Sequence, residues 1–282
     1  MSRHLAVLGS PIEHSKSPAL HTAAYRTLQL NWDYTRFETS QVQLGPFLDS
    51  LDTDWLGLSL TMPLKAEGLR LANEKSGLAI ATGAANTLLR TTSGWKAFNT
   101  DVFGIKMAIS SALSSQVRRA VIIGSGATAA SAVFAIAALA PESKIVVLAR
   151  NIESAKQLQQ RASNHAISVT VKKLASARAQ VAKADLTIST VPAQTLDAFW
   201  LKLARNPFFA IRGALLDVAY DPWPSVAAQL WLKKKSVVIS GIEMLIWQAI
   251  AQIRIFDHND IDIELPNERA VELAMRHSLG LI

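Results

Sequence analysis

The sequence has 282 residues, of which 50% are hydrophobic and none is cysteine, so extensive disorder, disulfide bonds and thiolate metal sites are excluded. The net charge is +7, and it is concentrated in the middle of the chain, where residues 102–236 hold 17 Lys and Arg against 6 Asp and Glu. A basic region of this kind predicts an anionic partner, either a nucleic acid or a phosphorylated small molecule.

The remaining charge and hydropathy patterns favour the small molecule. Lys233–Lys235 is the only basic run, and aromatic residues do not alternate with its cations as they do in a base-stacking surface. Residues 1–10 lack the long apolar segment of a signal peptide, and the apolar stretch 129–140 is much shorter than the ~20 residues that cross a bilayer. We therefore expect a cytoplasmic protein that binds neither nucleic acid nor membrane. The sequence leaves the oligomeric state open between a monomer and a homodimer.

The first hundred residues predict a mixed α/β sheet. A short apolar run at 5–8 predicts a strand, and helical spacing over 18–28 follows a Ser-Pro pair that is typical of a helix start. Residues 42–51 predict a helix interrupted near Gly45-Pro46, and Pro63 predicts a helix beginning there, because proline favours the first helical position. Further strands are expected at 32–37, 55–60, 86–90 and 95–98, the last two forming a hairpin.

Strands that alternate with helices begin at 120–123 and predict a parallel, doubly wound sheet. Further strands are expected at 144–148, 166–172, 184–190 and 214–218, with a buried helix at 129–140. A long apolar helix after Gly241 and an amphipathic helix at about 267–279 are expected to pack against the first domain. The sequence therefore predicts two domains, residues 1–101 with 241–282, and residues 102–240.

A glycine-rich turn lies directly after the strand at 120–123 and before the buried helix. Residues 124–129 match the pattern G-x-G-x-x-G/A, in which Gly124 permits a tight turn, Gly126 lets the backbone approach a pyrophosphate, and Ala129 allows close helix packing. The alternative is a plain turn without a ligand. The position between strand and helix favours a dinucleotide site, because the phosphates would meet free N–H groups at the helix N-terminus.

The residue at the end of the next strand indicates which dinucleotide is bound. An acidic side chain there would bond a free ribose 2′-hydroxyl, but the sequence reads Leu148-Ala149-Arg150-Asn151. The Arg150 guanidinium can instead pair with a 2′-phosphate, which favours NADP over NAD. The alternative is a solvent-facing arginine at a strand end.

A loop after the first strand carries two serines two residues apart, Ser15 and Ser17, and such a pair can bind a carboxylate. Ser17 before Pro18 also fits an ordinary helix N-cap, whereas Ser15 has no such local explanation.

Lys65 and Asp101 suggest acid–base chemistry. A ketone that accepts a hydride becomes an alkoxide and needs a proton, which a lysine ammonium held by a carboxylate can supply. The alternatives are a surface lysine and an aspartate that caps the following helix. Asn86 is a third polar residue at the end of a predicted element.

Four motifs in order resemble the shikimate dehydrogenase family, whose members reduce 3-dehydroshikimate with NADPH in aromatic amino-acid (chorismate) biosynthesis. The matching segments cover nearly the whole chain and run over 15–21, 60–65, 83–87 and 99–104. The resemblance implies an α/β fold with an N-terminal substrate-binding domain and a Rossmann-type NADP domain, with catalysis in the cleft between them. No grouping of His, Asp and Glu has metal-ligand spacing, so we expect no metal.

The resemblance also implies a role for particular residues. Lys65 and Asp101 would be the catalytic pair and would also contact the substrate. Ser15 and Ser17 would hold the substrate carboxylate, and the ring would be bound by Thr61, Asn86 and Gln248, with Tyr220 nearby. The cofactor would be bound by Gly124, Ser125, Gly126, Ala127, Thr128, Arg150, Thr190, Val191, Pro192, Val218 and Gly241.

The sequence departs from the family pattern in its cofactor half. Ala149 stands where the family has asparagine, Pro192 lacks the usual Gly-Met after it, and Ser225 replaces a common threonine. Two alternatives to the main interpretation stay open: an NAD-dependent quinate/shikimate dehydrogenase, and a catalytically idle protein that binds shikimate or NADP and regulates a partner.

Overall fold

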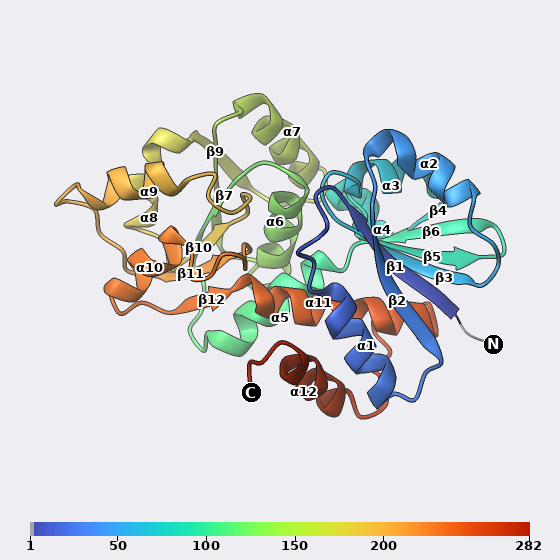
Figure 1. The fold of residues 1–282 in the computed structure, drawn as a ribbon. Helices are drawn as coiled ribbons and strands as arrows, with labels where there is room; N and C mark the ends of the chain where they lie inside the picture. Colours follow the sequence, from blue (N-terminus) through green and yellow to red (C-terminus); the bar gives the residue numbers. More distant parts are fainter. Residues whose placement is uncertain (1–2) are drawn as a thin grey trace. The chain divides into compact units, whose positions relative to one another are not determined.

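A computed structural model describes residues 3–282, and the chain divides into two compact units. Unit 1 comprises the chain up to Thr100 together with Leu245–Ile282, and unit 2 comprises Asp101–Met244. The two ends of the described chain therefore lie in the same unit (Figure 1).

Unit 1 is built on a mixed six-stranded sheet, as the sequence predicts. Its strand order is β2-β1-β3-β5-β6-β4, with β1 parallel to both β2 and β3, and β5 antiparallel to β3 and β6. The predicted hairpin is confirmed by the pairing of β5 with β6. The strands are β1 (Arg3–Gly9), β2 (Trp32–Glu38), β3 (Trp55–Leu60), β4 (Glu74–Lys75), β5 (Thr87–Thr91) and β6 (Gly94–Phe98).

The helices of unit 1 correct two predictions. Helix α2 continues through Pro46 without the predicted interruption. Ser40 and Gln43 form a capping box at its start. Helix α3 begins at Lys65 rather than at Pro63, which lies in the preceding turn. The helices are α1 (Ser17–Thr27), α2 (Gln41–Asp49), α3 (Lys65–Leu71), α4 (Gly77–Thr82) and α12 (Glu268–Ser278), together with most of α11 (Gly241–His258).

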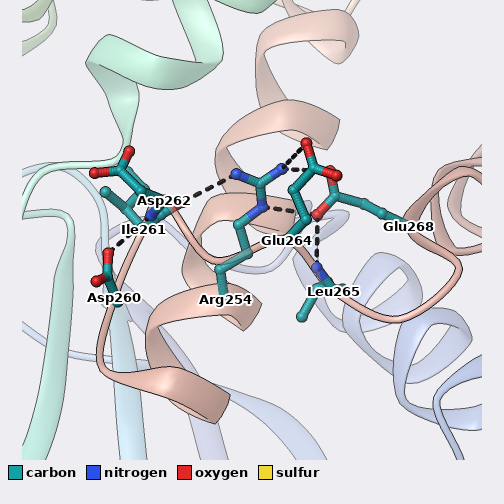
Figure 2. A network of polar contacts seen from close by, with 7 residues as sticks. All are labelled: Arg254, Asp260, Ile261, Asp262, Glu264, Leu265 and Glu268. Atoms are coloured by element: carbon teal, nitrogen blue, oxygen red, sulfur yellow. Dashed lines mark hydrogen bonds and ion pairs between the residues drawn. The ribbon is translucent and has the colours of Figure 1, made fainter.

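A buried arginine holds α11 to the segment that follows it. The Arg254 Nε atom donates a 2.7 Å hydrogen bond to Glu268, and Nη1 donates at 3.0 Å to the Ile261 carbonyl (Figure 2). Glu268 also accepts the backbone N–H of Leu265, and Glu264 approaches the guanidinium at 3.8 Å. Helix α12, which this cluster helps to place, contacts α1 on the outside of unit 1 (Figure 1).

Unit 2 contains a six-stranded sheet in which every pairing is parallel, which confirms the predicted doubly wound architecture. The strand order is β12-β11-β10-β7-β8-β9, and the order reverses between β10 and β8 at the central strand β7. The strands are β7 (Arg119–Ile123), β8 (Lys144–Ala149), β9 (Val169–Lys173), β10 (Leu186–Ser189), β11 (Ala214–Asp217) and β12 (Val238–Ser240).

The helices of unit 2 connect these strands. The apolar stretch at 129–140 lies in α6, most of whose residues are buried, so the prediction of a buried helix is confirmed. The elements are α5 (Asp101–Ala112), α6 (Ala127–Leu139), α7 (Ile152–Ser163), η1 (Leu174–Ser176), α8 (Ala177–Val181), α9 (Asp197–Ala204) and α10 (Val226–Lys233). Within residues 3–282, no helix combines the length and the apolar character needed to cross a membrane.

Candidate functional site

One edge of the unit 1 sheet gathers most of the residues expected to bind substrate. Strands β1 and β3 are parallel, with Leu8 opposite Leu60, so both carboxyl ends reach this edge. Strand β5 runs the other way, and its amino end lies there too, because Leu60 N–H donates to the Asn86 carbonyl at 2.8 Å. The carboxyl end of β6 completes the edge, with Phe98 opposite Thr87.

The serine loop follows β1 at this edge. Helix α1 begins at Ser17, with Lys16 at the N-cap and no side-chain capping bond, so the expectation that Ser17 acts as an ordinary N-cap is wrong. Ser17 is buried, and its N–H donates to the Ser15 Oγ atom at 3.4 Å. The two predicted carboxylate ligands are therefore close together at the start of α1, where Ser15 accepts the first helical N–H and the Ser17 side chain makes no capping bond.

Close approach of two backbones brings Thr61 to the serine loop. A Cβ atom on Gly9 would lie 2.3 Å from the Thr61 methyl group and 2.9 Å from the Met62 carbonyl, so only glycine fits. Lys65 follows as the first residue of α3, and its carbonyl accepts the Ala85 N–H at 2.8 Å. Thr61 and Lys65 are thus held beside the segments that carry the serines and Asn86.

Two carboxamides at this edge bond each other across 162 residues of sequence. Asn86 Nδ2 donates to Gln248 Oε1 at 3.2 Å, and both side chains are buried. Asn86 Oδ1 accepts the Thr100 N–H at 2.8 Å, and its Nδ2 donates to the Thr100 hydroxyl, also at 2.8 Å. The structure therefore brings Asn86 and Gln248 together, with a donor and an acceptor side by side.

Asp101 and Tyr220 belong to unit 2. Asp101 is the first residue of α5 and is 3% exposed, directly after the boundary between the units. Tyr220 is half-buried in the loop after β11. These two residues are the only predicted substrate contacts that unit 1 does not contain.

The glycine-rich turn of unit 2 requires glycine at its first position. Gly124 has φ +124°, and a Cβ atom there would lie 2.3 Å from the Thr190 hydroxyl. That hydroxyl donates to the Ile123 carbonyl at 2.8 Å, so Thr190 at the end of β10 directly supports the turn. Two segments predicted to contact the cofactor are therefore packed against each other at the point where the strand order reverses.

The same turn leaves room above the start of α6. Gly126 is the N-cap residue and has extended backbone angles, and a Cβ atom there would meet nothing within 4 Å. The helix begins at Ala127, so the first N–H groups of α6 have no partners inside the helix. Open space before free N–H groups fits a dinucleotide pyrophosphate.

The backbones of Val218, after β11, and Gly241, at the start of α11, also lie very close together. A Cβ atom on Gly241 would lie 2.1 Å from the Val218 carbonyl, so the two predicted cofactor residues Val218 and Gly241 are in contact. Asp217 is buried beneath them, and burial raises its pKa, although a 2.6 Å hydrogen bond from the Ser225 hydroxyl acts in the opposite direction. Ser225 also caps α10, which ties this loop to the helix that follows.

Arg150 stands at the carboxyl end of β8 with its side chain exposed. Asn151 behind it caps α7, since its Oδ1 atom accepts the Ser154 N–H at 3.1 Å. Ser154 in turn donates to the Ser125 carbonyl in the glycine-rich turn at 3.1 Å. The structure thus places Arg150 beside the turn, at the edge where a 2′-phosphate would be expected.

A separate hollow of about 530 Å³ lies at the opposite, amino-terminal edge of the unit 2 sheet. Arg118, Arg119, Lys144 and Lys183 line it together with two acidic residues, so part of the basic charge lies away from the glycine-rich turn. In the described part of the chain, no group of three or more His, Asp and Glu residues could hold a metal ion.

Sequence reasoning missed three polar residues at the unit 1 edge: Ser59, Thr100 and Gln252, all buried. Thr100 bonds Asn86, and Gln252 bonds the Asn86 carbonyl at 3.0 Å. Gln252 follows Gln248 by four residues on α11, and this spacing places both on one helix face. That spacing is the signal by which the sequence could have identified it.

Comparisons with known proteins agree with this arrangement. Residues 7–88 match the family model of the shikimate dehydrogenase substrate binding domain, and residues 106–197 match that of shikimate / quinate 5-dehydrogenase. The crystal structure of shikimate dehydrogenase from Mycobacterium tuberculosis is 36% identical, covers 98% of this chain and 99% of its own, and superposes with a TM-score of 0.84.

Two further relatives extend the comparison. The structure of shikimate 5-dehydrogenase from Thermus thermophilus in complex with NADP(H) and shikimate is 26% identical, with a TM-score of 0.80, and covers 98% of this chain and 99% of its own. Shikimate dehydrogenase (NADP(+)) from Ignicoccus hospitalis is 29% identical over 252 residues, which are 89% of this chain and 92% of that protein.

Proposed function

The chain belongs to the shikimate dehydrogenase family, and from that premise we propose that it catalyses the reversible NADPH-dependent reduction of 3-dehydroshikimate to shikimate. It is an oxidoreductase by this membership. The observation that carries the proposal is the buried Asn86–Gln248 pair, which offers one donor and one acceptor to a ring hydroxyl. The proposed product would lie in aromatic amino-acid biosynthesis.

We assign substrate binding to unit 1, with Ser15 and Ser17 holding the carboxylate and Thr61, Asn86 and Gln248 bonding the ring hydroxyls. The supporting observation is that these residues line one edge of the unit 1 sheet, in the part of the chain that matches a substrate-binding domain model. A hydroxyl both donates and accepts, so it can replace the 3.2 Å contact between the two carboxamides. Tyr220 would contact the substrate from unit 2.

We assign NADP binding to unit 2. The open space at Gly126 and the free N–H groups of Ala127 and Thr128 fit a pyrophosphate, and Ser125 lies in the same turn. The exposed guanidinium of Arg150 fits a 2′-phosphate. The nicotinamide would be bordered by the segments that hold Thr190, Val191 and Pro192, and Val218 and Gly241.

The catalytic pair in this proposal is Lys65 and Asp101. NADPH, when bound, supplies the hydride to the ring ketone. The Lys65 ammonium donates a proton to the ketone oxygen as negative charge develops on it, and Asp101 orients the ammonium and accepts a hydrogen bond from a neighbouring ring hydroxyl. In the reverse direction, neutral Lys65 accepts the proton from the substrate hydroxyl.

The test is the absorbance of reduced nicotinamide, measured with purified protein, shikimate or quinate, and NADP or NAD. We expect the absorbance to rise with shikimate and NADP, and to rise far less with NAD because Arg150 has no acidic neighbour suited to a free 2′-hydroxyl. A preference for quinate with NAD would overturn the assignment of substrate and cofactor. Silence in every combination, with folded protein, would instead indicate a regulatory binding protein.

A further inference from the structure

One face of α11 carries a second buried carboxamide directly below Gln248. Gln252 is 1% exposed, and its spacing of four residues from Gln248 places both side chains toward the unit 1 sheet. Phe256 continues the face, and a Cβ atom on Gly57 of β3 would lie 2.3 Å from its ring. The helix therefore packs on β3 so closely that Gln252 is enclosed between helix and sheet.

Gln252 lies in the middle of a chain of hydrogen bonds in which each group donates to the next, from Tyr34 towards Asn86. Its Nε2 atom donates to the Thr87 hydroxyl and to the Asn86 carbonyl, both at 3.0 Å. Its Oε1 atom accepts from the Ser59 hydroxyl at 2.9 Å, and Ser59 in turn accepts from the Tyr34 hydroxyl at 2.6 Å. Each hydroxyl has a single hydrogen, so the Ser59 hydroxyl, which donates to Gln252, can only accept from Tyr34.

The same sequence of donors and acceptors continues from Gln252 through Thr87 to Asn86 in the candidate substrate site. Because the Thr87 hydroxyl accepts from Gln252, its hydrogen is available for Asn86 Oδ1, which lies 2.9 Å away. The Thr87 hydroxyl and the Thr100 N–H, which donates to the same Oδ1 atom at 2.8 Å, together hold the oxygen of the Asn86 carboxamide on this side, and the amide hydrogens face Gln248 Oε1. A carboxamide in the opposite orientation would set two oxygen acceptors against each other at Gln248.

The far end of the chain of hydrogen bonds is uncharged. His21 stacks on Tyr34 with ring centroids 3.9 Å apart and lies 3.0 Å from the Tyr25 hydroxyl. Burial lowers the pKa of His21 to about 3, and the neighbouring Gln252 opposes this shift only in part. The histidine is therefore neutral near pH 7 and places no positive charge beside Tyr34.

We propose that Gln252 is a positioning residue that acts through Thr87, beside the Thr100 N–H, to hold the Asn86 carboxamide in one orientation, so that Asn86 presents a donor and Gln248 an acceptor to one hydroxyl of a cyclic polyol acid. This inference rests on the proposed function, because the ligand is the ring hydroxyl of shikimate. Gln252 itself touches neither substrate nor cofactor in this role. Its effect passes through Thr87 and the Asn86 carbonyl.

The experiment compares Gln252→Met, which keeps the side-chain length and removes the hydrogen bonds, with Gln180→Met. Gln180 is a buried glutamine of unit 2, 8% exposed, and provides the same chemical change away from this chain of hydrogen bonds. We expect Gln252→Met to raise KM for shikimate about tenfold, as loss of one oriented hydrogen bond does, with KM for NADP unchanged. Gln180→Met should leave both values unchanged.

Shikimate analogues that each lack one ring hydroxyl separate positioning from general damage. Wild-type protein should bind one of these analogues more weakly than shikimate, and Gln252→Met should lose about tenfold of that discrimination. Equal losses for shikimate and all analogues, or an unchanged KM for shikimate, would overturn the inference. If wild-type protein does not bind shikimate at all, the proposed function has failed instead.

Ser59→Ala is a milder variant in case Gln252→Met does not fold. It removes one bond to the Gln252 Oε1 atom and leaves the donors to Thr87 and Asn86 in place. We expect a smaller rise in KM for shikimate in the same direction, with KM for NADP unchanged. No change in the discrimination against any analogue would contradict the proposed order of hydrogen bonds.

Discussion

The candidate sites of the two units are constructed from different parts of the polypeptide. At the unit 1 edge, buried side chains such as Asn86 and Gln248 bond each other and define the site. At the unit 2 edge, the site is mostly backbone: free N–H groups of α6 and two glycines, Gly124 and Gly241, that let other segments approach. The first site depends on side chains that are present, the second on side chains that are absent.

This difference predicts opposite sensitivities to substitution. Removing atoms should damage the unit 1 edge, because each group left behind loses a buried partner. Adding atoms should damage the unit 2 edge, because a Cβ atom enters space that another segment or a phosphate needs. The substitutions below test this contrast, beginning with the largest expected effect.

Lys65→Ala is the most damaging removal that we expect at the unit 1 edge. Loss of the proton donor should lower kcat by about 10²- to 10⁴-fold, with the dissociation constant for shikimate changed far less. Steady-state kinetics and equilibrium binding of shikimate measure the two effects. Lys75→Ala, an exposed lysine on β4, is the matched control and should retain full activity. A Lys65→Ala protein at the wild-type rate would refute the catalytic assignment.

Alanine substitutions at the two glycines of the turn distinguish backbone strain, expected at Gly124, from obstruction of the cofactor, expected at Gly126. Gly124→Ala should destabilise the protein by roughly 1–3 kcal/mol, because residue 124 has φ +124° and the new methyl group would meet Thr190 at 2.3 Å. Gly126→Ala should leave the melting temperature nearly unchanged, because its Cβ atom points into open space, while KM for NADP rises about tenfold.

Thermal unfolding and cofactor titration of both variants test this pair. Equal loss of stability in both would show that Gly126 is needed for folding rather than for the cofactor. Unchanged NADP binding in Gly126→Ala would place the pyrophosphate elsewhere.

Arg150→Gln removes a charge rather than adding atoms, so it tests whether one side chain of unit 2 matters in an otherwise backbone site. We expect kcat/KM with NADP to fall about 10- to 100-fold, since a charge-assisted pair with a phosphate is worth roughly 1.5–3 kcal/mol. The value with NAD should hardly change. Arg161→Gln on α7 serves as the control. An equal fall with both cofactors would contradict a 2′-phosphate role.

The same contrast explains how much the sequence could predict. The glycine-rich turn is predictable because its six residues are contiguous and each has a local reason, and the structure confirms the strand, turn and helix around it. The hydrogen bonds of Gln252 to Ser59 and Thr87 join α11 to β3 and β5 across more than 160 residues, and no short pattern shows such a pairing. The predicted helix boundary at Pro63 is wrong because proline also suits the turn that precedes α3.

Lowering the pH should change the stability of the two units in opposite directions, through His21 in unit 1 and Asp217 in unit 2. The folded-state pKa of His21 in unit 1 is about 3, below its ordinary 6.5, so between these values the unfolded chain binds one more proton. His21 should therefore cost unit 1 about 1.4 kcal/mol for each pH unit lost below 6.5. Asp217 in unit 2 has a raised pKa, so the folded state binds the extra proton and acidification there favours folding.

Hydrogen exchange measured peptide by peptide between pH 6.5 and 4.5 can follow each unit, with rates corrected for the intrinsic effect of pH. Peptides around α1 and β2 should lose protection on acidification, and His21→Phe should remove most of that loss while keeping a ring against Tyr34. Peptides around β11 should not follow the same trend. Equal pH dependence in wild type and His21→Phe would show that His21 is not the group responsible, and that the buried network of unit 1 tolerates its protonation.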